Sequence, residues 1–263
     1  MSETDIEGLF SQTLIGDYDD GTPWQAVHDL RTIGTRQVFD RAAEWCRSSD
    51  DMRRARGADI LAQVGWNEDP SVTKAYKNEA LAILLSLLEV ESETQTIASA
   101  LHALGHIQQD AAISTVVSFA QHTNADVRYA VACALGQLSD DPVAIQTLIA
   151  LMMDEDEDIR DWATFGLGTQ SEADDEQIRE ALAARLNDEN EDVRFEALIG
   201  LGRRRDRRAI GYLKTILHDE PENTQAIEAA AMLLGLEEDT PVEVHWLLGA
   251  LQRLQRWGGQ SVT

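Results

Sequence analysis

The sequence predicts an all-α fold, a right-handed α/α superhelix of about seven stacked helix pairs. An apolar-Gly dipeptide recurs along most of the chain at a near-constant interval. Between these dipeptides, apolar residues return at three- and four-residue spacing, which is the period of one helix face. No segment alternates apolar and polar residues as an exposed strand would. Because only five prolines occur in 263 residues, long helices can form.

The recurring dipeptide sets the length of the repeat. Its copies are Ile33-Gly34, Val64-Gly65, Leu104-Gly105, Leu135-Gly136, Leu167-Gly168, Leu201-Gly202 and Leu234-Gly235. Successive glycines are 31, 40, 31, 32, 34 and 33 residues apart, so inserted residues lengthen the unit before Gly105. Glycine suits the left-handed conformation that often stops a helix. We therefore expect each of these glycines to end a helix.

Three consecutive units also carry an Asp-apolar-Arg triplet, and each arginine stands eight residues before its glycine. The triplets are Asp126-Val127-Arg128, Asp158-Ile159-Arg160 and Asp192-Val193-Arg194. An N-cap residue type lies two positions before each triplet aspartate, namely Asn124, Asp156 and Asn190. The aspartate then falls in the first turn, where the helix dipole favours an anion. The triplet therefore marks the beginning of a helix.

A second set of apolar-periodic segments alternates with these helices. They are Val38 to Trp45, Lys74 to Leu88, Ile113 to Phe119, Ile145 to Met152, Ile178 to Leu186 and Ile210 to Leu217. The unit is thus a helix pair of about 33 residues, and pairs must stack because one alone cannot bury its apolar face. We expect a single solenoid domain over residues 1–263, with an N-terminal capping region at 1–34 and a C-terminal capping helix at 236–257.

The Asp-apolar-Arg…Ala…Leu-Gly pattern resembles HEAT repeats of the phycobilisome-lyase type, most closely from Asp126 to Gly202. A narrower resemblance rests on Asp158 to Gly168, Ile178-Arg179, and Asp192 to Leu201 with Arg204, Asp206 and Arg208. It is to bacterial HEAT-repeat proteins encoded beside Rhs toxin elements, which are thought to act as immunity proteins. The first resemblance implies a HEAT-repeat solenoid and leaves a chromophore (phycobilin) lyase or lyase-like subunit as an alternative function.

The composition limits the class of partner. There are 47 acidic against 22 basic residues, a net charge of -25, which opposes nucleic-acid binding and favours a basic protein. No apolar run approaches the ~20 residues of a membrane helix, so we expect no membrane partner. The first residues, Met1 to Asp5, lack the basic and apolar regions of a signal peptide, so a cytoplasmic location is expected.

The triplet-bearing helices carry a candidate binding face, because the resemblance implies that such helices line the concave side. In the first of them the core stripe is Val127, Val131, Ala134 and Leu135, and at about 100° per residue Tyr129 and Cys133 lie opposite. Corresponding or flanking positions in the next two units hold Asp161, Trp162, Phe165, Phe195, Glu196 and Ile199. Aromatic residues on a solvent face favour partner binding. The alternative is that neighbouring repeats bury these side chains.

An arginine run follows Gly202, and two of its members complete the candidate site. The run consists of Arg203, Arg204, Arg205, Arg207 and Arg208, interrupted by Asp206. A guanidinium group holds a carboxylate in bidentate fashion, so these side chains would bind a partner or pair with the acidic loops of adjacent repeats. Arg204 and Arg208 are the candidates for partner binding at the rim, because the narrower resemblance includes both.

The sequence contains no convincing catalytic or metal site. His102 and His106 are four residues apart but belong to no HExxH motif, and no GxSxG, Walker A or GxGxxG motif occurs. Cys46 and Cys133 are too few for a zinc site. We therefore expect a non-catalytic scaffold without cofactor or metal, possessing a concave acidic and aromatic face that captures a basic toxin or nuclease as an immunity protein does.

Overall fold

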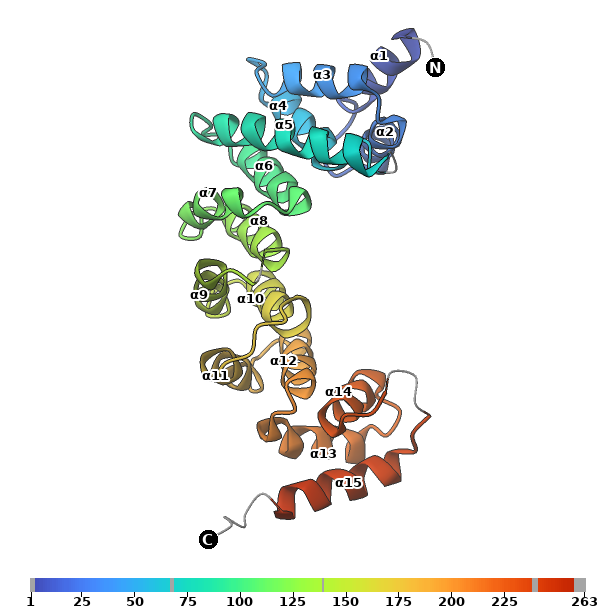
Figure 1. Ribbon diagram of the computed structural model, residues 1–263, viewed down its shortest axis with the longest axis vertical. Coiled ribbons are helices and arrows are strands. Elements are labelled where there is room, and N and C mark those ends of the chain that lie inside the picture. Colours follow the sequence, from blue (N-terminus) through green and yellow to red (C-terminus); the bar gives the residue numbers. More distant parts are fainter. Residues whose placement is uncertain (1–2, 67–68, 139, 238–240, 258–263) are drawn as a thin grey trace. The chain divides into compact units, whose positions relative to one another are not determined.

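The computed structural model describes residues 3–66, 69–138, 140–237 and 241–257. Within these ranges the chain forms fifteen α-helices, two 3₁₀-helices, one π-helix and no strand, which confirms the predicted all-α class (Figure 1). The chain divides into two compact units, Met1–Leu138 and Ser139–Thr263. No helix in the described ranges is both long and apolar enough to cross a membrane.

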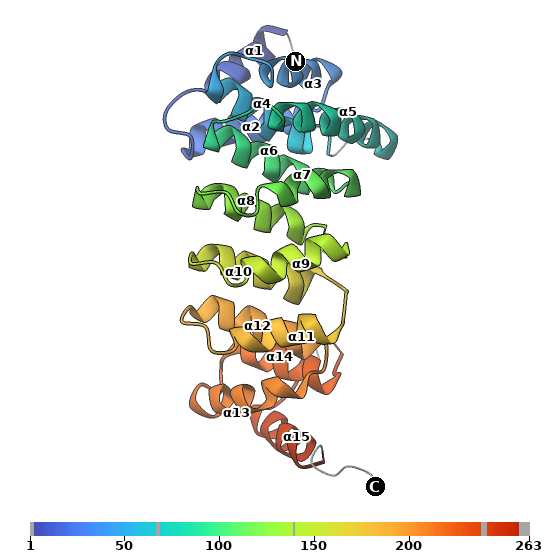
Figure 2. The ribbon, with the colours of Figure 1, turned by 90° about the vertical axis from the view of Figure 1, so that its left-hand side faces the viewer.

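Unit 1 stacks four helix pairs. Its α-helices are α1 (Glu3–Gln12), α2 (Gly21–Ile33), α3 (Arg36–Trp45), α4 (Asp51–Gln63), α5 (Pro70–Leu88), α6 (Thr94–Ile107), α7 (Ile113–Ser118) and α8 (Ala125–Gly136). The second helices of the pairs pack in one row, α2 on α4, α4 on α6 and α6 on α8. The first helix α3 packs on α5 in a parallel row (Figure 2). The predicted capping region at 1–34 contains α1 and α2.

Unit 2 continues with three pairs and a last helix. Its α-helices are α9 (Pro142–Leu151), α10 (Glu157–Phe165), α11 (Glu176–Arg185), α12 (Glu191–Arg203), α13 (Ile210–Asp219), α14 (Thr224–Leu234) and α15 (Val244–Trp257). The second helices α10, α12 and α14 form the row, and α9 packs on α11. A π-helix, η2 (Gly166–Gln170), extends α10. The predicted capping helix corresponds to α15, and each predicted first helix is present.

The N-caps predicted from the triplets are confirmed. The side chain of Asn124 accepts a hydrogen bond from the main chain of Val127, three residues later. Asp156 and Asn190 each accept from the main-chain N–H groups two and three residues later. These contacts satisfy donors that the first turn of a helix otherwise leaves unpaired, so each side chain fixes where its helix begins.

The glycine prediction is only partly right. Gly34 and Gly235 adopt the left-handed conformation, with φ of 60° and 70°, and end their helices as expected. Gly105 and Gly202 instead lie within α6 and α12. A Cβ on Gly105 would lie 2.8 Å from Cα of Ala134, and one on Gly202 would lie 2.6 Å from the carbonyl oxygen of Ala229. Glycine is needed there because the next second helix approaches backbone to backbone.

In four of the pairs, an arginine four residues after the N-cap ties the loop to the second helix. It occurs four times, as Arg54, Arg128, Arg160 and Arg194. Each guanidinium turns back and donates to the carbonyl two residues before its own N-cap, over 2.8–3.1 Å. Arg54 is a copy that the triplet pattern missed, because Met52 replaces the aspartate in that unit.

Two of these arginines also reach the following pair. Arg54 donates through Nε and Nη2 to Glu91 over 2.6 and 3.1 Å, and Arg160 donates in the same way to Asp188 over 3.0 and 2.9 Å. Both carboxylates lie two residues before the N-cap of the next second helix, with side chains 4% exposed. We call this bidentate contact an interrepeat ion pair. It fixes the register of successive pairs.

We predict that Arg160→Gln lowers the free energy of unfolding by about 2–3 kcal/mol, because the nearly buried Asp188 then retains only Arg185 as a cationic partner. The matched control is Arg36→Gln. The ion pair of Arg36 with Asp40 has both side chains more than half exposed, so its loss should cost less than about 1 kcal/mol. Urea unfolding followed by circular dichroism measures both changes. Equal losses in the two variants would contradict the structural role of the interrepeat ion pair.

Candidate protein-binding surface of α10 and α12

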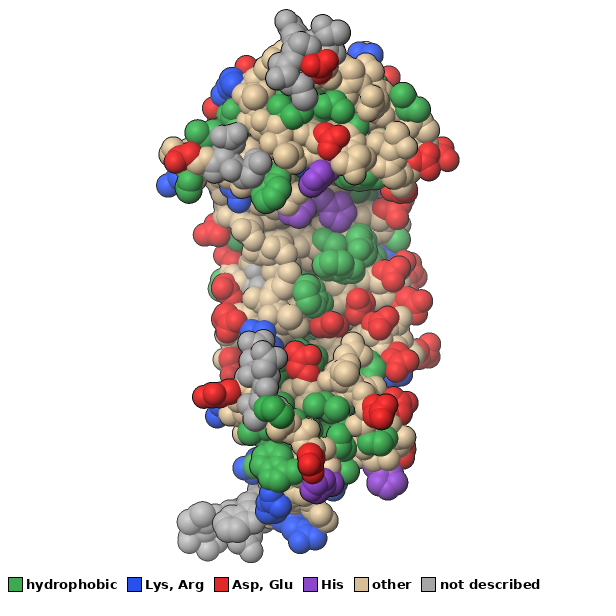
Figure 3. All heavy atoms as spheres, turned by 90° about the vertical axis from the view of Figure 1, so that its right-hand side faces the viewer, with side chains coloured by type: hydrophobic (Ala, Val, Ile, Leu, Met, Phe, Trp, Pro, Cys, Tyr) green, Lys and Arg blue, Asp and Glu red, His purple; other side chains and the backbone are tan. Residues whose placement is uncertain are grey.

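Six of the predicted site residues lie on adjacent second helices of unit 2, and five of them are half-buried. Of these five, Asp161, Trp162 and Phe165 belong to α10, and Glu196 and Ile199 belong to α12. Figure 3 shows the side of the molecule on which the second helices lie, where hydrophobic and acidic side chains of unit 2 are intermixed. We call these five residues the α10–α12 surface.

The aromatic part of this surface is preorganised. The rings of Trp162 and Phe165 meet edge to face, with centroids 5.6 Å apart and an interplanar angle of 85°. Such a contact restrains both side chains before any partner arrives. The π-helical turn begins directly after Phe165, and its Thr169 hydroxyl donates to the Glu196 carboxylate over 3.2 Å. The π-helix therefore connects the aromatic pair to the acidic part of the surface.

Two acidic groups of the surface are desolvated and lack a cationic partner within the described part of the chain. Burial raises the pKa of Asp161 to about 6, and Asp192 and Asp158 add to the rise. Burial likewise raises the pKa of Glu196 to about 7, with Asp161 as the next cause. One carboxylate oxygen of Asp161 is buried without a hydrogen-bond partner among the described residues. By contrast, Asp188 and Asp206 are both held by arginine.

Tyr129 belongs to unit 1 and is described separately. It lies half-buried on α8, where its ring meets that of His102 at a centroid distance of 6.0 Å. Both side chains line a cavity of about 460 Å³. Burial lowers the pKa of His102 to about 4, so the imidazole is neutral at pH 7. The binding role predicted for Tyr129 stays a prediction.

Phe195 does not lie on an exposed face, contrary to the sequence-based expectation. Its side chain is only 7% exposed and faces α13, where it lines a cavity together with Leu198 and Ile216. On a helical wheel Phe195 lies opposite the core stripe of α12. That side of α12 is not open solvent, because it faces the cavity between α12 and α13.

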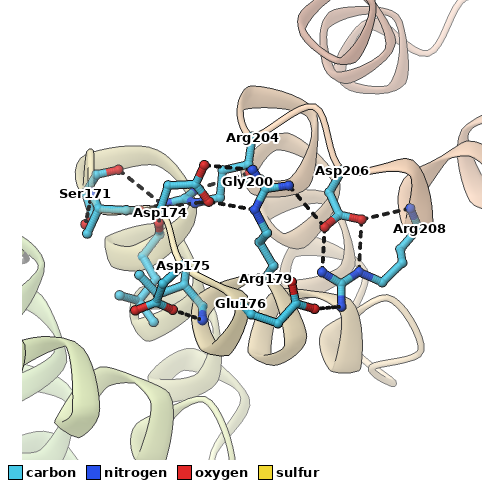
Figure 4. Close-up of polar contacts among 12 residues, drawn as sticks. Ser171, Asp174, Asp175, Glu176, Arg179, Gly200, Arg204, Asp206 and Arg208 are labelled. Carbon is cyan, nitrogen blue, oxygen red and sulfur yellow. Dashed lines mark hydrogen bonds and ion pairs between the residues drawn. The ribbon is translucent and has the colours of Figure 1, made fainter.

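Arg204 is not a rim residue either. It is 8% exposed, and its guanidinium donates to the carbonyls of Leu167, Gly168 and Gly200 over 2.7–3.2 Å (Figure 4). It also donates to the carbonyls of Ser171 and Ala173. A π-helix end leaves carbonyl groups without helical partners, and Arg204 satisfies them. The structural interpretation of this arginine is therefore the correct one.

Arg208 pairs within unit 2, although its side chain is 36% exposed. It donates to both carboxylate oxygens of Asp206 and to Glu176 over 3.0 Å (Figure 4). Arg179 joins Asp206 to Asp174 in the same network. The guanidinium of Arg208 is thus already engaged, and the α10–α12 surface does not include it.

Sequence reasoning missed a buried polar cluster in unit 1. The Tyr18 hydroxyl donates to Asp59 over 2.6 Å and lies 2.7 Å from the Ser99 hydroxyl. Arg56 is fully buried and donates to Asp59 and to the carbonyls of Thr13 and Tyr18. The cluster holds the loop between α1 and α2 against α4. The only sequence signal was an Arg and an Asp three residues apart in an otherwise small and apolar run.

The described residues contain no group of three or more His, Cys, Asp and Glu side chains that could hold a metal ion. Cys46 is buried, and burial raises the pKa of its thiol to about 12. Such a thiol stays protonated and is a poor nucleophile.

The arrangement of α10 and α12 is suited to binding through apolar contact and charge.

Comparison with known proteins identifies the repeat. The model of the family described as HEAT repeats matches residues 81–168 and 145–235. The YibA protein of Escherichia coli has a similar structure, with 24% identity, a TM-score of 0.69, and coverage of 96% of this chain and 93% of that one. No curated protein matches the sequence significantly.

Two further structures share the fold. An archaeal HEAT-like repeats protein from Thermococcus onnurineus is 17% identical, with a TM-score of 0.55 and coverage of 95% of this chain and 98% of that one. A designed armadillo repeat protein in complex with the peptide (KR)4 is also 17% identical, with a TM-score of 0.50 and coverage of 76% and 98%. Since the family model matches residues 81–235, which is more than half of the chain, this protein belongs to the HEAT-repeat family.

Proposed function

We propose that this protein is a non-catalytic binding scaffold whose α10–α12 surface captures a basic protein. The observation that carries the proposal is the pair of desolvated carboxylates, Asp161 and Glu196, beside the aromatic pair Trp162 and Phe165. Neither carboxylate has a cationic partner among the described residues, whereas the nearly buried Glu91 and Asp188 are each paired with arginine.

The energetics favour a basic partner over an apolar or acidic one. An ionised carboxylate that has lost water without gaining a cation is destabilised. A lysine or arginine side chain placed between Asp161 and Glu196 would remove this cost and form charge-assisted hydrogen bonds. Trp162 and Phe165 would supply apolar area at the same place. The net charge of -25 would accelerate the encounter with a basic partner.

The most specific form of the proposal is an immunity protein that acts in the cytoplasm and masks a basic toxin, such as a nuclease. It is supported by the resemblance to Rhs-associated HEAT-repeat proteins and by the acidic charge. Co-expression with a toxin encoded beside the gene tests it, and restored growth is the expected result. Unchanged toxicity at equal expression of both proteins would contradict the immunity role.

The binding function is tested separately with a defined basic probe. A designed armadillo repeat protein binds the peptide (KR)4, so a fluorescent (KR)4 peptide is a suitable ligand. We expect Asp161→Asn combined with Glu196→Gln to weaken binding at least about tenfold, which is about 1.4 kcal/mol. Glu180→Gln, an exposed acid on α11, is the matched control and should have little effect. Equal affinities for the two variants would show that only diffuse charge attracts the peptide.

We predict that Trp162→Ala and Phe165→Ala each weaken binding of the basic partner by about 2 kcal/mol, as hot-spot aromatic residues do. Both side chains are half-buried, so stability should fall less than in Ile159→Ala. Ile159 lies on the same helix and is fully buried, and its truncation should cost about 2–4 kcal/mol. Thermal melts and peptide titrations measure the two effects. If Trp162→Ala and Phe165→Ala are as unstable as Ile159→Ala, both rings belong to the core and the prediction is wrong.

We also predict that Glu196→Gln stabilises the free protein at pH 8 by about 1 kcal/mol, a value reduced for the partial solvation of the group. The folded-state pKa of Glu196 is about 7, above its ordinary value, so the folded protein binds more protons than the unfolded chain between about pH 4.5 and 7. The contribution of Glu196 to the free energy of unfolding is therefore greatest at low pH and is lost as the pH rises towards 7. The gain should vanish at pH 4, and a gain independent of pH in thermal melts would refute this cause.

A further inference from the structure

A groove separates α12 from α13 in unit 2. Its volume is about 500 Å³. Phe195 and Leu198 of α12, Ile216 of α13 and Leu186 at the end of α11 form its apolar floor. Arg194 and Glu220 lie at its polar edge. The groove is distinct from the α10–α12 surface, because none of the five residues of that surface lines it.

The groove exists because α13 departs from the row of first helices. In the preceding pairs α9 packs on α11, whereas α13 packs on α14 and α15 (Figure 1). The 3₁₀-helix Arg207–Ala209 leads into α13. The groove-lining residues of α12, from Glu191 to Leu198, stand at helical spacing and form one continuous face. This face is left partly uncovered.

Unlike Arg54 and Arg160, Arg194 lacks an interrepeat ion pair within the described part of its unit. Arg54 and Arg160 bind carboxylates two residues before the N-cap of the next second helix. For Arg194 that N-cap is Asn223, and the corresponding position holds Pro221. Among the described residues, Arg194 bonds only through Nη1, to the carbonyls of Asp188 and Glu189. Its Nε and Nη2 donors therefore remain open at the groove.

We propose that the groove binds an apolar helical segment of a partner protein, and that a carboxylate on this segment pairs with Arg194 as Asp188 pairs with Arg160. The inference goes beyond the proposed function, because it concerns another surface and the opposite charge. Two helix faces of about two turns each define the groove, and such a groove fits a third helix laid along it. The open donors of Arg194 match the geometry that a carboxylate accepts in bidentate fashion.

The neighbouring acids do not exclude a carboxylate. Glu191 precedes Arg194 by three residues, just as Glu157 precedes Arg160. Asp188 nevertheless binds Arg160 with both oxygens within 3.0 Å, despite the nearby Glu157 and Glu189. In the preceding pair, the same local arrangement around Arg160 thus tolerates a bound carboxylate, and we expect the same of Arg194. The ligand carboxylate would take the place that a residue at position 221 would otherwise fill.

Gly211 allows the groove to be closed without disturbing the fold. It lines the groove, and a Cβ built on it meets nothing within 4 Å. Gly211→Leu should therefore fill the groove and leave the melting temperature unchanged or higher, since leucine is also the better helix former. Gly8→Leu on α1 is the matched control, because a Cβ there also meets nothing within 4 Å.

The experiment uses two synthetic peptides of about 14 residues, each an amphipathic leucine helix with one central aspartate or asparagine. Fluorescence anisotropy measures their binding to the full chain. We expect the aspartate peptide to bind wild type at least about tenfold more tightly than the asparagine peptide. Arg194→Gln should abolish this preference. Gly211→Leu should weaken both peptides at least tenfold, and Gly8→Leu should bind as wild type does.

Three results would overturn the proposal. The first is that wild type binds neither peptide or binds both equally. The second is that Gly211→Leu, shown by its melt to be folded, binds as wild type does. The third is a concentration-dependent dimer of wild type that Gly211→Leu abolishes, which would assign the groove to a second copy of the chain. Binding of (KR)4 is proposed to depend on the α10–α12 surface, so the two proposals can fail independently of each other.

Discussion

The fold depends on one recurring constraint, the arginine that follows four of the second-helix N-caps by four residues. Its guanidinium closes the loop between the two helices of a pair by donating to carbonyls that helix formation leaves unpaired. The guanidinium groups of Arg54 and Arg160 also bind a carboxylate of the next pair. A single side chain thus links the loop of its own pair to the next pair, and Arg160 in this way connects α10 to the loop before α12.

The acidic residues of this chain fall into two physical classes. Asp188, Glu91 and Asp206 are nearly buried and bound by arginine, so their charge belongs to the architecture. Asp161 and Glu196 are desolvated next to each other, have no such partner among the residues that the structure describes, and have raised pKa values. A scaffold selected only for stability would have replaced them with apolar or amide side chains. Their presence beside two aromatic rings is consistent with selection for binding.

Local chemistry made much of the fold predictable, and tertiary contacts account for what was not. The N-caps Asn124, Asp156 and Asn190 were identified correctly because a cap needs only its own first turn. Gly202 was assigned as a cap because the approach of Ala229, 27 residues later, leaves no local signal. Phe195 was placed in solvent because no periodicity reveals which neighbouring segments bury it. The ligands of Arg204 are main-chain carbonyls, which carry no sequence signature.

The glycines inside the second helices also determine how each unit deforms. At Gly105 and Gly202 two backbones touch with no side chain between them, so this row cannot be compressed further. Successive first helices, such as α3 and α5 or α9 and α11, pack less extensively. Within a unit, bending should therefore change the distances between first helices more easily than it shortens the row of second helices.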